Sequence, residues 1–421
     1  MGSERLKRIS WMDSVLAYNI VLGPMGTIVQ LFILSLHGSV IDVSLAVTAY
    51  SAVNIPAAIL WGFITDRFNK RKTLIIVSYF VSGVVLFSFL FAKTVYSVSF
   101  LYALFSFATS ASTTPLNLLV METERKQKWA MAFARLSMIA SFGQIVGLFL
   151  SMTWSLFFPL GYIVVVLSAL SLVSAVLSVL LIREPAIVFE RDVIAMNKPS
   201  FFERLKTVPY FFLRIPRAKD FRRFFKTLRY DLTRQVPLLY FSIFGFYLTS
   251  GLFNTSVVPS LEANGVPTLL IFLVTTVVMV VQVVSFKYAG PYIEKLSLVR
   301  AAVGGLGLRS ITYGLLGVSV FLVSGIWLLV PFLIFYPLAG GIAYAIYYTA
   351  SNTMVFNTLR HTNQGSRLGI YSALVGIATM AGSFISGFTS FYLGFYTTFI
   401  LAAIGLAISA WAISKLPSEE N

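Results

Sequence analysis

A group of charged side chains stands in the stretch "GFITDRFNKRK", which runs from Gly62 to Lys72. Asp66 lies four residues after Gly62 and is followed by Arg67 and Arg71. A carboxylate can bind the positive N-terminus of a neighbouring helix, and an arginine can form paired hydrogen bonds with an acid. Glycine allows two helices to approach closely. The stretch is suited to polar contacts between helices, although its cations can also serve only to orient the chain in a membrane.

Residues suited to covalent or metal chemistry are scarce. The 421 residues include no cysteine and two histidines, and the polar stretch "RHTNQGSR" around His361 shows no metal-ligand spacing. Neither a phosphate-binding glycine loop nor a Gly-x-Ser-x-Gly elbow occurs. We therefore expect a protein that is not an enzyme and that needs no cofactor or metal.

The composition is that of a membrane protein. Hydrophobic residues make up 57% of the chain and charged residues only 11%, whereas a soluble domain carries about 25% charged residues. A span needs about 20 apolar residues. Twelve such runs are predicted, at residues 12–36, 42–65, 73–92, 97–121, 129–153, 159–182, 236–259, 267–289, 298–323, 326–357, 366–391 and 393–414. An all-α integral membrane protein follows, with the long tenth run expected to include a break at "PLAGG".

Lysine and arginine gather on one set of connections, and Lys93 is the single cation of the other set. The rule that cytoplasmic loops are positive places both termini in the cytoplasm, in a cell membrane. The net charge of +16 is then a topology signal, and nucleic-acid binding is not expected.

A basic segment at 183–234 divides the chain into a first half, 1–182, and a second half, 235–421. Residues 221–234 place aromatic and aliphatic side chains on one helical face and cations on the other. Such a helix suits a layer of anionic lipid headgroups, or equally a linker packed on the bundle.

The two halves share a weak repeat. The pairs at an offset of 228 residues are Gly62 with Gly290, Asp66 with Glu294, Arg67 with Lys295 and Lys72 with Arg300. A second alignment, at an offset of 239, places Lys128 on Arg367 and Gly143 on Gly382. Each half holds six predicted helices that start on the same side, so the repeat is parallel.

These residues resemble the signature of the major facilitator superfamily between its second and third helices. Gly62, Asp66, Arg67, Arg71 and Lys72 match it, while Asn69 replaces a glycine, and Val299 replaces a cation in the second copy. The resemblance implies two six-helix bundles that rock about a central site. It also implies that this loop is a latch between helices 2 and 11, for which Glu122 and residues 366–369 are candidate partners.

The resemblance further implies that helices 1, 4, 7 and 10 line the substrate cavity. Small hydroxyl residues there can serve packing alone, but amides and tyrosines are costly to leave unpaired in lipid. The predicted cavity residues are Asn19, Gln30, Asn117, Tyr344, Tyr348 and Asn352.

Charges inside the predicted spans are few. Arg135 could bind an anionic group in the cavity or reach Glu122 or Asp13. Arg309 lies on helix 9, which the resemblance places at the lipid-facing periphery, so we expect it to snorkel or to pair within the second half. No acid falls in the middle of a span, which leaves Asp13 and Glu122 as the candidates for proton coupling.

The expected function is secondary transport of a small organic solute, with protons as a further candidate partner. An uncharged, tyrosine-rich cavity favours export or exchange of a neutral or amphiphilic compound by a monomer. Uptake of a sugar or metabolite is the nearest alternative. A lipid translocase or a transport-like receptor is an alternative of another class.

Overall fold

The computed structural model describes residues 10–68, 70–123, 129–182, 237–294, 296–358 and 364–416, and every regular element in these ranges is helical. Within these described ranges, twelve helices are long and apolar enough to span a membrane, which confirms the predicted number. The first half comprises α2 (Ser10–Ser35), α3 (Val40–Phe68), α4 (Arg71–Ser88), α5 (Val95–Thr123), α6 (Trp129–Phe157) and α7 (Ile163–Leu181). The second half comprises α11 (Pro237–Ala263), α12 (Thr268–Glu294), α13 (Leu298–Leu322), α14 (Leu329–Pro337) with α15 (Tyr344–Thr358), α16 (Gln364–Leu393) and α17 (Phe395–Ser414).

The tenth span is continuous but irregular. A 3₁₀ turn at Gly325–Leu328 leads into α14, and a π-helical segment at Leu338–Ala343 joins α14 to α15. The predicted break at "PLAGG" is therefore a change of helical pitch. A β-carbon at Gly341 would lie 3.1 Å from the backbone nitrogen of Gln282 on α12. Segments of this kind are frequent at functional sites, and here it directly precedes Tyr344.

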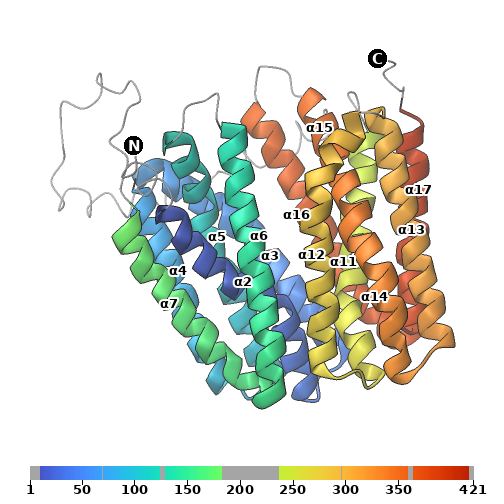
Figure 1. Ribbon diagram of the computed structural model, residues 1–421, viewed down its shortest axis with the longest axis horizontal. Coiled ribbons are helices and arrows are strands. Elements are labelled where there is room, and N and C mark those ends of the chain that lie inside the picture. Colours follow the sequence, from blue (N-terminus) through green and yellow to red (C-terminus); the bar gives the residue numbers. More distant parts are fainter. Residues whose placement is uncertain are drawn as a thin grey trace, which may run out of the picture.

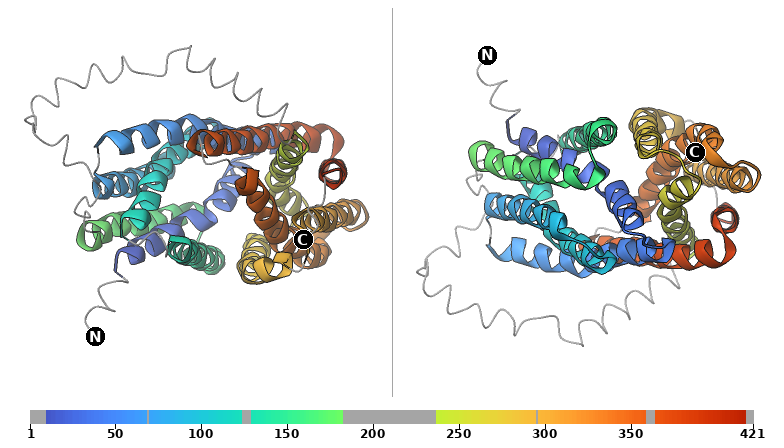
Figure 2. Two further views of the ribbon diagram at one scale, coloured as in Figure 1. Left: turned by 90° about the horizontal axis from the view of Figure 1, so that it is seen from above. Right: turned by 90° about the horizontal axis from the view of Figure 1, so that it is seen from below.

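The start of α2 and the end of α17 lie at the same end of the bundle, which we call the terminal end; the opposite one is the far end (Figure 1). The halves meet along two lines, where α3 packs on α16 and α6 on α12 (Figure 2). The predicted basic linker at 183–234, with its amphipathic helix at 221–234, lies outside the described residues. The division at these boundaries stays a prediction.

The internal repeat is visible in the packing of each half. The first and fifth helices of each half, α2 with α6 and α11 with α16, are in close contact. A β-carbon at Gly23 would meet the backbone oxygen of Gln144, and one at Gly251 would meet the backbone oxygen of Thr379. The two glycines are 228 residues apart. Backbones this close are possible because glycine has no side chain.

The structure corrects the second predicted alignment by one helical turn. Gly147 faces the backbone of Ile20 at a distance that excludes any side chain, and Gly382 faces Leu248 in the same way. Ile20 and Leu248 are again 228 residues apart. Gly382 is therefore the counterpart of Gly147 and not of Gly143. Glycines four residues apart lie on one helical face, so the sequence alone did not distinguish the two registers.

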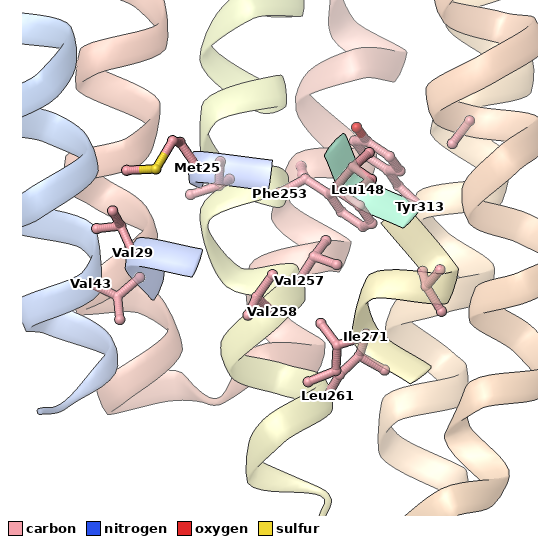
Figure 3. Packing of buried hydrophobic residues seen from close by; sticks show 14 of the residues in the cluster. Met25, Val29, Val43, Leu148, Phe253, Val257, Val258, Leu261, Ile271 and Tyr313 are labelled. Carbon is pink, nitrogen blue, oxygen red and sulfur yellow. The ribbon is translucent and has the colours of Figure 1, made fainter. Parts of the chain in front are cut away.

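At the far end the halves are packed against each other. The Ser44 hydroxyl on α3 donates to the backbone oxygen of Ser383 on α16 at 2.6 Å. A β-carbon at Gly387 would lie 3.1 Å from the Cα of Ile41. One apolar cluster, which includes Val29, Val43, Val257, Val258 and Leu261, joins residues of both halves (Figure 3). The far end is closed by polar contacts and by apolar packing.

Toward the terminal end the helices of the first half lean away from the second half. The direction of α2 shows this clearly, because its last turns approach α11 and its first turns do not (Figure 1). Side chains in the terminal part of α3 are exposed, Ile59 to 60% and Leu60 to 40%. The two halves therefore diverge from a closed far end.

The glycine contacts within each half make a testable prediction. Gly382→Ala places a methyl group against the backbone of α11, and we expect it to lower the free energy of unfolding by about 1–3 kcal/mol. Gly307→Ala is the matched control, because nothing lies within 4 Å of a β-carbon there. Thermal unfolding of the two purified variants measures the difference, and equal melting temperatures would contradict the close packing.

Candidate functional site

Three of the predicted cavity residues lie along one face of α15. Tyr344 and Tyr348 stack with ring centroids 5.5 Å apart at an angle of 17°. The Asn352 side chain donates to the backbone oxygen of Tyr348 at 2.9 Å. Tyr348 is 37% exposed. An aromatic surface with phenol and amide groups is thus presented by the second half.

Neighbouring helices extend this surface. Phe286 of α12 lies edge-on to Tyr344 and to Tyr348, with centroid distances of 6.1 and 5.7 Å. Tyr247 of α11 and Tyr371 of α16 approach these tyrosines and each other. The Tyr371 hydroxyl is buried beside Tyr247. We call Tyr247, Phe286, Tyr344, Tyr348 and Tyr371 the tyrosine surface.

Arg309 of α13 lies directly behind the tyrosine surface. Its side chain is only 2% exposed. The Tyr313 hydroxyl accepts hydrogen bonds from Nε at 2.9 Å and from Nη2 at 2.6 Å. The guanidinium carbon lies 4.5 Å from the ring centroid of Phe246 and 5.5 Å from that of Tyr344. Aromatic rings attract a cation through their negative faces.

The surroundings of Arg309 differ from those expected. It is buried within the second half and does not face lipid, because α13 turns this residue toward α11 and α15. The expected pairing within this half is found, but with a tyrosine. Its Nη1 is buried and forms no hydrogen bond to the described residues. The sequence signal was the spacing of Arg309 and Tyr313, one helical turn apart. The rings of Phe246 and Tyr344, which also lie against Arg309, come from other helices and had no local signal.

The predicted residues of α2 lie within the first half. Asn19 donates to the Val15 backbone oxygen at 2.8 Å and accepts from the Gln144 side chain of α6 at 3.3 Å. These contacts join α2 to α6. Gln30 is 9% exposed, and its Oε1 has no hydrogen-bond partner in the described part of the chain. Gln30 keeps free acceptor capacity, whereas Asn19 serves as a contact between helices.

Asn117 of α5 and Arg135 of α6 are exposed. No described contact brings them together with Asn19, Gln30 or the tyrosine surface. An exposed amide in a span is costly in lipid, which favours a position beside water for Asn117.

The predicted latch is described only in part. Arg71 donates to the Thr65 backbone oxygen at 2.6 Å and Lys72 to that of Val179 at 2.6 Å, so both bind helix C-termini of their own half. The nearest described atom to a β-carbon at Gly62 is the Thr114 hydroxyl oxygen, at 4.0 Å. The side chains of Asp66, Arg67, Asn69 and Glu122 lie outside the described residues.

The second copy of the motif shows a similar arrangement. No described atom lies within 4 Å of a β-carbon at Gly290. Arg300 is exposed, and its backbone N–H donates to the Ser297 side chain, which caps α13. The side chains of Glu294 and Lys295 are not among those described. The latch role of both copies stays a prediction.

Acidic residues of the described spans all stand at helix ends. Asp13 and Asp42 are in the first turns of α2 and α3, and Glu262 is in the last turn of α11. Asp42 accepts hydrogen bonds from the N–H and hydroxyl of Ser39, at 2.7 and 2.8 Å, and so caps its helix. No described acid is placed to neutralise Arg309.

Comparison with known proteins gives one family. The model of the Major Facilitator Superfamily matches residues 14–229 and 239–420. No curated protein sequence matches the chain.

Solved structures with a similar fold include several transporters. The nucleoside transporter NupG shares 11% identity at a TM-score of 0.68, with 98% of this chain and 100% of that chain covered. A bacterial homologue of the human lysosomal transporter Spinster, solved in an inward-facing and unoccupied conformation, shares 13% identity at a TM-score of 0.70, with 97% and 96% covered. The peptide transporter POT in complex with sulfate shares 10% identity at a TM-score of 0.73, with 97% and 95% covered. These similarities concern the fold.

The Arg309 environment generates a second prediction. Tyr313→Phe removes the hydroxyl that accepts two hydrogen bonds from the buried guanidinium, and we expect a loss of about 2–3 kcal/mol in the free energy of unfolding. Tyr396→Phe makes the same chemical change at a ring that is 40% exposed and should be nearly neutral. The comparison of their melting temperatures is the measurement. A Tyr313 variant as stable as the Tyr396 variant would show that the guanidinium has other partners.

Proposed function

The chain belongs to the major facilitator superfamily, a family of membrane transporters, and we propose that it exports or exchanges a small amphiphilic organic solute. The solute binds at the tyrosine surface, and the two halves rock about it in alternating access. The observation that carries this proposal is the stacking of Tyr344 on the exposed ring of Tyr348, a surface that α12 extends with Phe286.

Tyrosine rings favour a solute with an aromatic or extended apolar body. A stacked or edge-on ring contact contributes about 0.5–1.5 kcal/mol beyond the burial of its area. The phenol hydroxyls and the Asn352 amide add a few directed hydrogen bonds, which fix the orientation of a bound molecule.

The conformation supports alternating access. The far end is sealed by the α3–α16 contacts and the apolar cluster, while the halves diverge toward the terminal end. We place the terminal end on the cytoplasmic side of a cell membrane, because described cations such as Lys70, Lys72 and Arg300 lie there. The structure is then inward-facing, and no described residue packs tightly against Gly62 on α3.

Coupling follows from the position of the acids. No described carboxylate lies in the middle of a span. This favours exchange or facilitated movement of the solute, since neither needs a titrating group in the membrane. Proton coupling would have to use an acid at a helix end, Asp13 or Glu122.

The binding surface makes the third prediction. A thermal-shift screen of the purified protein against a compound library identifies a solute, since a ligand raises the melting temperature of the state that binds it. Tyr348→Ala should then weaken its apparent affinity by about threefold to tenfold, as expected for one ring contact. Tyr396→Ala, at an exposed ring of α17, is the matched control. A sugar as the best ligand, or equal affinities in both variants, would reject the proposed solute class.

The closed far end makes the fourth prediction. Gly387→Val pushes a side chain against Ile41 and Ser44 and should shift the population toward a conformation open at the far end. The chain has no cysteine, so Val258→Cys, at a residue only 3% exposed, can report access to an impermeant thiol reagent.

The reaction rate of Val258→Cys should rise several-fold when Gly387→Val is added. Gly161→Val is the control, because a β-carbon at this position meets nothing within 4 Å. Equal rates in the two combinations would show that the far-end seam does not control access.

A further inference from the structure

We infer that Arg309 binds an anionic group of the transported solute, an inference that rests on the proposed function of the tyrosine surface. The solute class is thereby narrowed to amphiphiles that carry one negatively charged oxygen group, such as a carboxylate or a sulfonate, on an aromatic or apolar body. The argument depends on the charge, the depth and the accessibility of Arg309.

Among the described residues, no carboxylate pairs with the charge of Arg309. Arginine remains protonated in proteins, and a buried cation is costly unless it is paired. Two of its nitrogens donate to one neutral hydroxyl, while the buried Nη1 has no acceptor among the described residues. The rings of Phe246, Tyr313 and Tyr344 offset a part of the cost. An orphan donor on a buried guanidinium is the feature that a purely structural cation would lack.

The depth of Arg309 is that of a transport site. It is eleven residues from Leu298, where α13 begins, which places it roughly 17 Å along the helix. The hydrocarbon core is about 30 Å thick, so this position is close to its middle. The acids of the described spans stand at helix ends, too far along their helices to neutralise a charge at this depth.

A single side chain separates Arg309 from the exposed part of the tyrosine surface. The guanidinium carbon of Arg309 lies 5.5 Å from the ring centroid of Tyr344. The ring centroid of Tyr348, which stacks on Tyr344, is also 5.5 Å from it. Tyr348 is 37% exposed. Rotation of Tyr344 about its side-chain bonds would therefore open a path from the exposed rings to Nη1. The apolar body of a solute would remain on the tyrosine surface while its anion reached the arginine.

The test measures the electrostatic potential at this surface with charged reagents of similar size. A single cysteine, Tyr348→Cys, is introduced into the full chain, which has none of its own. It is modified by anionic sulfonatoethyl methanethiosulfonate or by cationic trimethylammonioethyl methanethiosulfonate. At each cysteine the rate with the anionic reagent is divided by the rate with the cationic reagent. Comparing this ratio at Tyr348→Cys with the ratio at Asn54→Cys, on an exposed part of α3, reports the local charge and cancels differences in thiol reactivity.

We expect the ratio at Tyr348→Cys to favour the anionic reagent. It should fall by about tenfold when Arg309→Gln is added, because one unscreened charge is removed, and should be largely retained with Arg309→Lys. If Arg309→Gln does not fold, the rate ratios of Tyr348→Cys and Asn54→Cys, both measured with Arg309 intact, test the anion site without it.

Each result has one meaning. Equal ratios at the two cysteines, or a ratio that Arg309→Gln leaves unchanged, would overturn the anion site while leaving the tyrosine surface accessible and the proposed function intact. A failure of both reagents to modify Tyr348→Cys, with Asn54→Cys still reactive, would overturn the anion site and also the proposed binding surface.

Discussion

The close contact between the first and fifth helices of each half is the interaction on which the rest of the structure depends. Gly147 against Ile20, and Gly382 against Leu248, bring two backbones together where no side chain fits. In lipid, where apolar surface alone gives little reason for helices to associate, such packing holds them together. Each half is thereby a firm unit, and movement is left to the seams between the halves.

Those seams carry different contacts at their two ends. The far end combines the Ser44 hydrogen bond with an apolar cluster shared by both halves, so it can open only as a whole. The terminal end presents the tyrosine surface between diverging helices. Behind that surface the π-helical segment turns α15 so that Tyr344 covers Arg309. The structure thus combines a closed far end, a partly exposed aromatic surface and a buried charge with no acidic partner among the described residues.

Much of this fold was predictable from the sequence, because hydrocarbon requires each span to satisfy its own backbone hydrogen bonds as a helix. The twelve spans follow from that requirement. The parallel repeat, in which Gly62 corresponds to Gly290, follows from the spacing of residues in the sequence. The setting of Arg309 was not predictable, since Phe246 and Tyr344 come from other helices. Neither was the register of Gly382, because helix geometry makes Gly143 and Gly147 equivalent in a sequence. The latch of Asp66 and Glu122 remains a prediction.

The central claim, that two firm halves rock between a closed and an open far end, is tested most directly by distances between spin labels. One pair, at Lys93→Cys and Ser324→Cys, spans the far end, and a second pair, at Lys70→Cys and Lys415→Cys, spans the terminal end. In liposomes, addition of a solute found by thermal shift should lengthen the far-end distance and shorten the terminal one together. Distances that change at one end alone, or at neither, would contradict the account.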